Sequence, residues 1–408
     1  MTSPELKSVA AHLAHILSVV HPLSPLDLGL QEAHGCILAE DVVAPAALPG
    51  FDNSSMDGYA VRTEDLRALP VVLPVVGDLA AGPASTLRLQ SGLCVRIMTG
   101  AALPAGADAV VPVEWTDGGT TSVRIDRAPV PGDFIRRAGE DVRAGEVVLT
   151  AGSYLGSAQI GLAAAVGRGH LVAQPRPRVV VLSTGSELVD AGGELSAGMI
   201  FDSNSPALAA AVQEAGAIAY RIGIVPDDPK LLADVIEDQL VRADVIVTSG
   251  GVSVGAYDVV KEVLSSMGTM RFDRVAMQPG MPQGFGTIGP DRTPVFGLPG
   301  NPVSALVSFE AFVRPALRLL LGATPVDRPQ VAARTTAPLS SPQGKQSFVR
   351  VRLDLGPSGY TVTPVSGPGS HLLAGMARAN GLAIVPAEVE RVEAGQLVQT
   401  LVLERRGR

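Results

Sequence analysis

The sequence predicts a multidomain α/β protein whose central domain is a parallel-type sheet with helices on both faces. Between residues 176 and 322, apolar β-branched runs alternate with amphipathic helical runs, which is the pattern of strands joined by crossover helices. On either side, residues 45–137 and 323–408 hold short β-branched runs separated by Gly, Pro and Asp, as β-rich domains do. At 408 residues the chain also exceeds what one hydrophobic core normally supports, so several domains are expected.

The central region is predicted to contain four strands, each followed by a helix. Ser205 and Pro206 give one helix a cap and a first turn, and Asp228 and Pro229 do the same for the next. The expected strands are 178–184, 217–225, 243–251 and 293–300, and the expected helices are 205–216, 227–243, one ending near 267, and 301–322. In the last region, strands are expected at 347–355, 360–365, 381–388 and 396–404.

The N-terminal segment is predicted to be an amphipathic helix over residues 4–20. Its apolar residues recur at helical spacing, and Thr2 and Glu5 have the spacing of a capping box with Pro4 in the first turn. Helical character returns at 157–167. We therefore interpret the β-rich region between these segments as an insertion.

Composition excludes several classes of protein. The net charge of −8 and an aromatic content of 4% disfavour nucleic-acid binding, since a phosphate backbone repels an acidic surface and single strands need stacking platforms. Cys36 and Cys94 are far apart and form no CxxC, which fits a reducing compartment without a thiolate zinc site. No signal peptide and no membrane span are evident, so a cytoplasmic protein is expected.

The stretch VIVTSGGVSVGAYDVV, residues 245–260, leads from an apolar strand into a glycine loop that is followed by Asp258. Gly250, Gly251 and Gly255 allow the backbone N–H groups to approach an anion at the start of a helix. The motifs GxxxxGK[ST] and GxGxxG are both absent here, so neither a P-loop nor a Rossmann site is indicated. Taken alone, the loop could equally be a plain strand-to-helix turn.

Polar side chains recur at the ends of the other predicted strands. Each one alone is explained as a helix cap or a turn residue. Because the carboxyl ends of parallel strands converge at one edge, we expect these side chains to gather near the glycine loop. Oxygen ligands beside such a loop suggest Mg²⁺ holding a phosphorylated substrate. The residues are Glu187, Asp202, Asn204, Asp227 and Asp228.

The insertion carries a second group of polar residues in turn-rich segments. FDNSSMDGYAVR, residues 51–62, is too polar for a strand core. Arg136 and Arg137 suit phosphate or carboxylate, although a solvated charge run explains them equally well. His371 is interpreted as an ordinary surface histidine. The candidates here are Asp52, Asn53, Asp57, Thr99, Arg136, Arg137, Glu140 and Asp141.

These segments resemble, in order and spacing, those of the MoeA-type molybdopterin molybdenumtransferases, the family that includes the gephyrin E-domain. The SGGVSVG segment alone is not specific, because other molybdopterin-binding modules share it, but so many linked motifs over nearly the whole chain are. The matching segments are PGFDNSSMDGYAVR, RIMTGAALPAGADAVV, RRAGEDV, STGSEL, DSN, SGGVSVGAYD and GLPGNPVSA.

The resemblance implies four domains and a homodimer. The domains would be an elongated N-terminal domain (1–44 and 138–175), an inserted β-rich domain (45–137), an α/β molybdopterin-binding domain (176–322) and a C-terminal β domain (323–408). Each active site would combine the α/β domain of one subunit with the inserted domain of the other. The upstream adenylyltransferase is a further expected partner.

The resemblance also implies the reaction and its residues. The family converts adenylylated molybdopterin and molybdate, with Mg²⁺, into molybdenum cofactor and AMP. By motif match, the catalytic positions are Asp57, Thr99, Asp141, Glu187, Asp227 and Asp258, of which Glu187, Asp227 and Asp258 would hold the metal. The substrate-binding positions would be Ser249, Gly250, Gly251, Ser253, Gly255, Asp202, Asn204, Arg274, Pro299, Pro302 and, more weakly, Ser370.

One departure from the family pattern concerns the segment MQPGMPQGFG, residues 277–286. Gln278 and Met281 stand where a KPGKP-type stretch has lysines, while Arg274 keeps a positive charge nearby. If the two lysines make charge-assisted contacts, the loss of each one would weaken oxyanion binding by roughly 1–3 kcal/mol. The alternative to the enzyme is therefore a non-catalytic molybdopterin-binding scaffold. A third hypothesis, an adenylyl-transfer or pyrophosphate-cleaving enzyme using the α/β module alone, leaves the polar insertion unexplained.

Overall fold

The computed structural model describes residues 6–83, 86–250 and 259–403, and the chain divides into two compact units. Unit 1 comprises Met1–Leu26, Gly35–Ala39 and Val172–Arg408, and unit 2 comprises Asp27–His34 and Glu40–Leu171. Each unit has its own hydrophobic clusters and is described by itself.

Unit 1 contains a six-stranded sheet with the order β16-β13-β17-β21-β20-β18. The first four strands pair in parallel, which confirms the strand–helix alternation predicted between residues 176 and 322. The last two pair antiparallel, so the sheet is mixed. The strands are β13 (Arg178–Thr184), β16 (Ile218–Val225), β17 (Val245–Ser249), β18 (Arg271–Arg274), β20 (Pro282–Ile288) and β21 (Thr293–Leu298).

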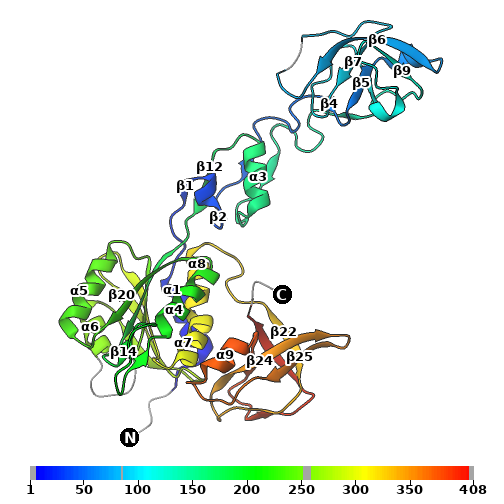
Figure 1. Ribbon diagram of the computed structural model, residues 1–408. Coiled ribbons are helices and arrows are strands. Elements are labelled where there is room, and N and C mark those ends of the chain that lie inside the picture. The colour runs from blue at the N-terminus through cyan, green and yellow to red at the C-terminus, as the bar shows by residue number, and fades with distance from the viewer. Residues whose placement is uncertain (1–5, 84–85, 251–258, 404–408) are drawn as a thin grey trace. The chain divides into compact units, whose positions relative to one another are not determined.

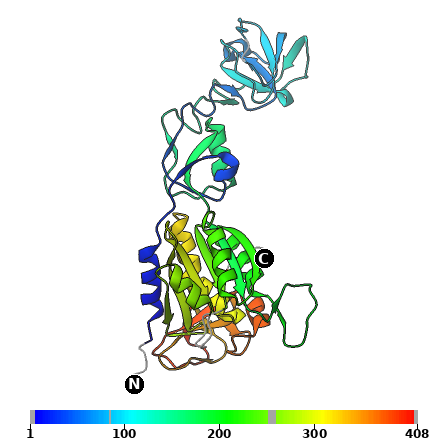
Figure 2. The same ribbon diagram turned by 90° about the vertical axis from the view of Figure 1, so that its left-hand side faces the viewer.

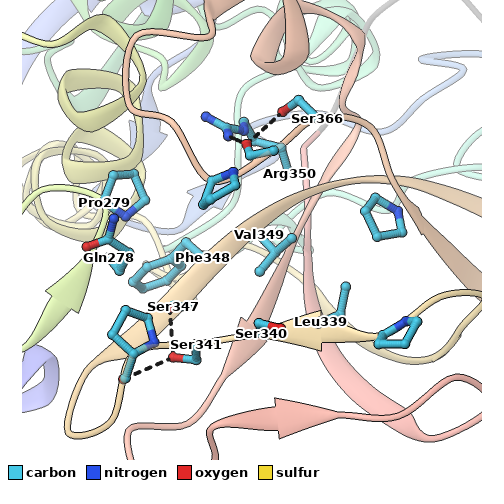
Figure 3. A pocket seen from close by; sticks show the side chains of 15 residues that line it. Gln278, Pro279, Leu339, Ser340, Ser341, Ser347, Phe348, Val349, Arg350 and Ser366 are labelled. Carbon is cyan, nitrogen blue, oxygen red and sulfur yellow. Dashed lines mark hydrogen bonds between the residues drawn. The ribbon is translucent and has the colours of Figure 1, made fainter.

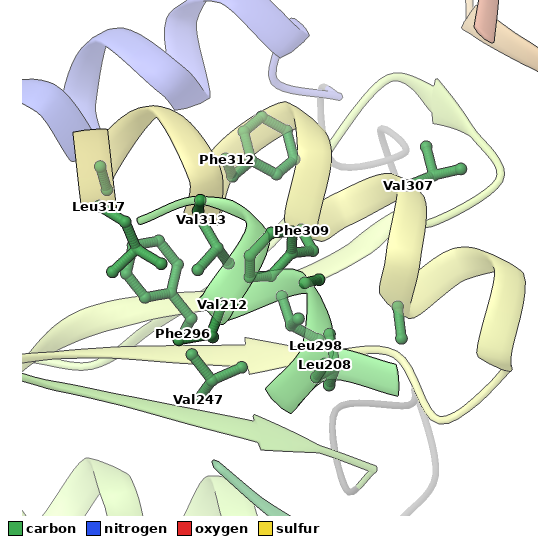
Figure 4. Close-up of a cluster of buried hydrophobic side chains, with 14 of the residues drawn as sticks. Leu208, Val212, Val247, Phe296, Leu298, Val307, Phe309, Phe312, Val313 and Leu317 are labelled. Carbon is green, nitrogen blue, oxygen red and sulfur yellow. The ribbon is translucent and has the colours of Figure 1, made fainter. Parts of the chain in front are cut away.

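Helices cover both faces of this sheet because successive strand residues point to opposite sides. Val179, Val181 and Val247 face one hydrophobic cluster with α1, α4, α7 and α8, which Figure 4 shows in part. Val180 and Ile246 belong to the other cluster with α5 and α6. Figure 1 shows α5 and α6 on one side of the sheet and α1, α4, α7 and α8 on the other. The helices are α1 (Val9–Val19), α4 (Asn204–Glu214), α5 (Pro229–Leu240), α6 (Val259–Met267), α7 (Pro302–Ser308) and α8 (Arg314–Leu320), with a π-helical turn at Phe309–Val313.

Two helix starts differ from those expected, and one agrees. Helix α1 begins at Val9 with Ser8 as its cap, whose hydroxyl accepts from Ala11 N–H at 3.1 Å, so the start predicted from Thr2 and Glu5 was wrong. Instead, Lys7 pairs in parallel with Val275 at the edge of unit 1, and α1 packs beside the sheet (Figure 2). Helix α4 starts at Asn204, and the Asp228 cap predicted for α5 is confirmed at 2.9 Å from Leu231 N–H.

Helix α1 places His12 in the interior, 3.4 Å from an Asp273 oxygen and against the ring of Phe312. Burial lowers the pKa of His12 from 6.5 to about 4, and the Lys7 charge adds to this effect while Asp273 opposes it. The charged imidazolium is disfavoured in this position because it loses its hydration.

We expect the free energy of unfolding to decrease as the pH falls from about 6.5 to about 4. In this window the unfolded chain binds a proton at His12 that the folded protein does not bind, and the loss reaches roughly 2 kcal/mol at pH 5. Urea unfolding of the wild type and of His12→Gln at pH 7 and pH 5 measures it. The variant should lose less stability between the two pH values, and an equal loss in both would contradict the assignment.

The C-terminal part of unit 1 is a β-barrel. Strands β24, β25, β22, β28 and β26 pair in that order, and β26 pairs again with β24, which closes the ring. Strand β19 joins β24 in parallel, so Gln278 is paired with the barrel. The strands are β19 (Met277–Gln278), β22 (Gln330–Thr335), β23 (Leu339–Ser340), β24 (Gln346–Gly356), β25 (Gly359–Pro364), β26 (Gly381–Val385), β27 (Arg391–Val392) and β28 (Leu397–Val402), with helix α9 (Leu373–Arg378).

Unit 2 is built around a five-stranded sheet with the order β8-β5-β7-β6-β9, which confirms β structure in the insertion. Its core is formed by Tyr59, Val61, Cys94, Val111 and Ile125. The elements are α2 (Leu30–Ala33), β3 (Val42–Val43), β4 (Asn53–Ser54), β5 (Gly58–Val61), β6 (Val71–Leu79), β7 (Cys94–Ile97), β8 (Ala109–Pro112), β9 (Ser122–Ile125), β10 (Ile135–Arg136), β11 (Val147–Leu149) and α3 (Ser157–Ala165), with 3₁₀ turns at Thr63–Leu66 and Val113–Trp115.

The remaining strands are short. Strand β2 (Ile37–Leu38) pairs with Ala173 and Gln174 of β12 (His170–Gln174), and β14 (Leu188–Val189) pairs in parallel with β15 (Ile200–Phe201). Strand β1 covers Leu26–Gly29. Among the helices that the structure describes, none is long and apolar enough to cross a membrane.

Candidate active site

The carboxyl ends of β13, β17 and β21 meet at one edge of the unit 1 sheet. Ser183 is in register with Ser249, and Ser249 with Leu298. The N–H of Gly250 donates to the Leu298 carbonyl at 3.1 Å, and a Cβ on Gly300 would lie 3.6 Å from the Gly250 Cα. The strand ends predicted to converge do so, and the loop that follows β21 lies directly beside the start of the glycine loop.

Gly250 occupies a backbone conformation that only glycine adopts easily. Its φ is +98°, and a Cβ there would lie 2.5 Å from the Thr184 carbonyl oxygen. The close approach of β13 and β17 at this point therefore requires the glycine. The other candidates of this loop, Gly251, Ser253, Gly255 and Asp258, lie outside the described residues.

Asp202 is buried at this edge and organises it. Its carboxylate accepts hydrogen bonds from the Ser183 hydroxyl at 2.9 Å, from the N–H groups of Asn204 and Ser205 at 3.0 and 3.1 Å, and from the Ser205 hydroxyl. Arg221 lies 3.7 Å away. This network joins the end of β13 to the first turn of α4, so the structure places Asp202 as the residue that anchors α4.

Asn204 and Pro302 continue the same edge toward the β21–α7 loop. The Asn204 amide donates to the Gly300 carbonyl at 2.7 Å. Pro302 is the first residue of α7, and the N–H of Val303 donates to the Ser370 carbonyl at 3.0 Å. Ser370 is thereby tied to the loop that holds Pro299 and Pro302, so these three sequence-predicted positions lie together.

Asp227 and Glu187 form the exposed acidic part of the edge. Asp227 accepts from the Ser186 N–H at 3.1 Å, which ties the loop after β16 to the loop after β13. Glu187 follows Ser186 directly, and its carboxylate folds back over Gly185. In the described part of the chain no three His, Cys, Asp or Glu side chains form a metal-holding group. The edge thus offers two exposed carboxylates besides the buried Asp202, with Asp258 outside the described residues.

Arg274 and the segment Met277–Met281 lie beside each other in unit 1. The Arg274 guanidinium lies 3.5 Å from the Met281 sulfur, so its charge stands beside the position where the family pattern has a lysine. The amide of Gln283 donates to the Gly280 carbonyl and to the Ser308 hydroxyl, at 2.6 Å each. This buried amide holds the turn at Gly280, whose φ is +98°.

A cavity of about 570 Å³ opens beside Gln278, between the β18–β20 connection and the C-terminal barrel (Figure 3). Arg350 on β24 lines it and is buried; its guanidinium donates to the Gly369 carbonyl at 3.0 Å and to that of Gly367. Burial lowers the pKa of Arg350, and within the ranges that the structure covers no carboxylate pairs with this cation, so the cavity suits an anion.

Arg350 was missed by sequence reasoning. It lies in the run SFVRVRLDL, where it looks like one of two strand arginines. The second, Arg352, is exposed and pairs with Asp354 at 3.3 Å. The signal in the sequence was weak. Arg350 is two residues from Phe348 and therefore shares its strand face, which predicts more burial than an arginine at the surface has.

In unit 2, Asp57 and Thr99 are directly bonded. The N–H and the hydroxyl of Thr99 both donate to one Asp57 oxygen at 2.7 Å. These bonds, the backbone one first, lower the pKa of Asp57, so the exposed carboxylate stays ionised. Two positions that the sequence places 42 residues apart thus form one anionic group.

The remaining polar residues of unit 2 differ in their contacts and exposure. Arg137 donates to Asp52 at 2.6 Å, and the Ala138 N–H donates at 2.8 Å, which lowers the pKa of Asp52. Arg137 is therefore already neutralised. Asp141 is exposed, and its N–H donates to the Leu48 carbonyl at 3.1 Å.

Three protein-family models match the chain in sequence order. The MoeA N-terminal region, domains I and II, matches residues 7–167, a probable molybdopterin-binding domain matches 180–319, and the MoeA C-terminal region, domain IV, matches 332–403.

Full-length relatives decide the assignment. Molybdopterin molybdenumtransferase 2 of Mycobacterium tuberculosis is 48% identical over 404 residues, which cover 97% of this chain and 99% of the relative. The chain belongs to the MoeA family. Molybdopterin molybdenumtransferase 1 of the same organism is 43% identical and is covered completely.

The fold agrees with the MoeA assignment. A crystal structure of a molybdopterin biosynthesis MoeA protein from Pyrococcus horikoshii aligns with a TM-score of 0.79 at 32% identity, covering 98% of this chain and 100% of that one. The resemblance inferred from the linked motifs is thereby confirmed. The comparisons confirm the family and its multidomain fold.

Proposed function

We propose that this chain is a molybdopterin molybdenumtransferase, which inserts molybdate into adenylylated molybdopterin with release of AMP. The observation that carries the proposal is that Glu187, Asp227 and Gly250, the first residue of the glycine loop, lie at one sheet edge in a full-length MoeA relative. Such an edge holds phosphate groups through backbone N–H groups and a cation through carboxylates.

The polar groups at the strand ends can bind the phosphate groups of the substrate through a metal ion. Glu187 and Asp227 fit Mg²⁺, which commonly takes one or two protein carboxylates and completes its shell with water and substrate phosphate oxygens. When bound, the ion would neutralise the pyrophosphate link that is cleaved. Asp202 and Asn204 keep the α4 start and the Gly300 loop fixed, which orients the edge for the substrate.

The proposal places molybdate, the oxyanion substrate, in the cavity at Gln278. Arg350 lies buried there without a carboxylate partner in the described chain, and Arg274 stands beside Met281. Two guanidinium groups thus lie close to the two positions where lysines are replaced, so the positive charge that an oxyanion needs is retained.

Assembly and location complete the proposal. We propose a homodimer whose sites combine the α/β domain of one subunit with the insertion of the other, which would bring the Asp57–Thr99 group and Asp141 to the substrate. The proposed domains are 1–44 with 138–175, 45–137, 176–322 and 323–408, supported by the three family-model matches. We propose a cytoplasmic location and exchange of substrate with the upstream adenylyltransferase.

The test is a turnover assay on the purified protein. Adenylylated molybdopterin, Mg²⁺ and molybdate are supplied, and AMP and protein-bound molybdenum are followed. Molybdate-dependent AMP release is expected. Substrate binding without release would instead support the scaffold, and AMP release that ignores molybdate would support the pyrophosphate-cleaving alternative.

We expect the double variant Gln278→Lys, Met281→Lys to change the KM for molybdate by less than about tenfold, because Arg350 and Arg274 already supply positive charge. Arg350→Gln should raise the same KM by roughly tenfold or more, since a charge-assisted contact is lost. Arg352→Gln, on the same strand but exposed, is the matched control. A large gain from the two lysines would show that the departure limits the reaction.

A further inference from the structure

Among the described residues, the hydroxyl of Thr184 has no hydrogen-bond partner, although it is buried at the end of β13. Thr184 is the last residue of β13 and is 5% exposed. Its Oγ1 is a buried oxygen to which no residue of the described ranges is hydrogen-bonded. A Cβ placed on Gly250 would lie 3.0 Å from this oxygen, so the hydroxyl points at the hydrogen-bearing face of Gly250.

The neighbouring hydroxyl groups at the same strand ends are all bonded. Ser183 donates to Asp202 at 2.9 Å and lies 3.2 Å from the Ser249 hydroxyl, and Thr248 donates to the Phe296 carbonyl at 3.4 Å. Thr184 differs from these three although it stands among them. A buried hydroxyl without a partner destabilises a protein, and buried polar groups nearly always have one.

We propose that the Thr184 hydroxyl is a substrate contact that donates a hydrogen bond to an oxygen of the bound adenylylated molybdopterin. The inference rests on the proposed function and adds to it a residue of the STGSEL segment that was not among the predicted site residues. Gly250 has no side chain, and a Cβ there would lie 3.0 Å from the hydroxyl, so only a glycine at this position leaves the oxygen uncovered on that side. The unsatisfied hydroxyl of the free protein then gains its partner when the substrate binds.

The sequence around Thr184 supports this assignment. It is followed by Gly185, Ser186 and Glu187, so the hydroxyl lies at the base of the loop that carries the acidic edge. Donation from a neutral hydroxyl suits a charged oxygen acceptor, and such bonds are stronger than those between neutral groups.

The test compares Thr184→Val with Thr400→Val. Thr400 on β28 is the matched control, because its hydroxyl is also buried and has no partner among the described residues, but it lies in the barrel. Valine keeps the shape and removes only the hydroxyl. Both variants should match or exceed the wild type in melting temperature, since neither loses a hydrogen bond of the free protein.

Binding of adenylylated molybdopterin, measured by equilibrium dialysis, and the KM of AMP release should separate the variants. Thr184→Val should weaken both by roughly ten- to hundredfold, as loss of one bond to a charged oxygen does. Thr400→Val should leave both unchanged, and Thr184→Ser should bind like the wild type.

Four results would overturn the inference. If Thr184→Val binds the substrate as tightly as an active wild type, the inference is refuted while the proposed function stands. An equal loss of affinity in Thr400→Val would have the same meaning. A lower melting temperature in Thr184→Val would show that the hydroxyl has a partner in the free protein. A wild type that neither binds the substrate nor releases AMP would refute the proposed function and the inference together.

Discussion

Replacing Gly250 by alanine will destabilise the protein and abolish AMP release. The new Cβ would lie 2.5 Å from the Thr184 carbonyl oxygen and 3.0 Å from its hydroxyl, so the ends of β13 and β17 have to separate. The φ of +98° adds the strain of a left-handed conformation. Together these effects should lower the free energy of unfolding by roughly 2–5 kcal/mol, which urea denaturation measures.

Gly192→Ala is the control that isolates the backbone strain. Gly192 has a φ of +93°, but nothing lies within 4 Å of the position of its Cβ. It should lose only about 1–2 kcal/mol and keep its activity, because no strand has to move. If the two variants lose the same stability, the close approach of β13 and β17 does not require glycine.

The parallel part of the sheet was predictable because its strands are buried on both faces. Runs such as residues 178–184 are apolar throughout, and a strand of this kind is distinguishable from a half-exposed one. The Asp228–Pro229 pair identified the start of α5 because a cap depends only on residues within one turn. Both features are local, so the sequence contains the information directly.

Features that depend on distant residues were not predictable in this way. Strand β20 runs through Gly284 and Gly286, which suggest a loop in the sequence. In the structure they allow close packing, since a Cβ at Gly284 would lie 2.8 Å from the Phe272 ring and one at Gly286 would lie 2.6 Å from the Met270 Cα. The start of α1 was misplaced for the same reason, because pairing of Lys7 with Val275 excludes the first residues from the helix.

The candidate site shows the same division. The sequence indicated which carboxylates follow strand ends, but not which of them are buried. Asp202 and Asp227 both follow such strands in polar turns, yet one is enclosed by donors and the other is exposed. Arg350 was missed because its cavity is formed by segments some 70 residues away in the chain, at Gln278 and Pro279.

Asp202→Ala will unfold the start of α4 and lower the free energy of unfolding by roughly 3–5 kcal/mol. The substitution leaves the hydroxyls of Ser183 and Ser205 and two N–H groups without their acceptor, and it leaves Arg221 without the buried charge beside it. Removing one member of a buried charged network costs this much because the remaining groups stay buried without partners. Urea denaturation and circular dichroism measure the loss.

Asp227→Ala is the matched comparison, because Asp227 also bonds a serine but lies at the surface. It should change the free energy of unfolding by less than about 1 kcal/mol while AMP release falls by at least tenfold. The pair separates two roles that the sequence presents alike: a carboxylate that builds the edge and one that is proposed to act there. Were Asp202→Ala to remain stable and lose only activity, Asp202 would be a substrate ligand, as the family motif implied.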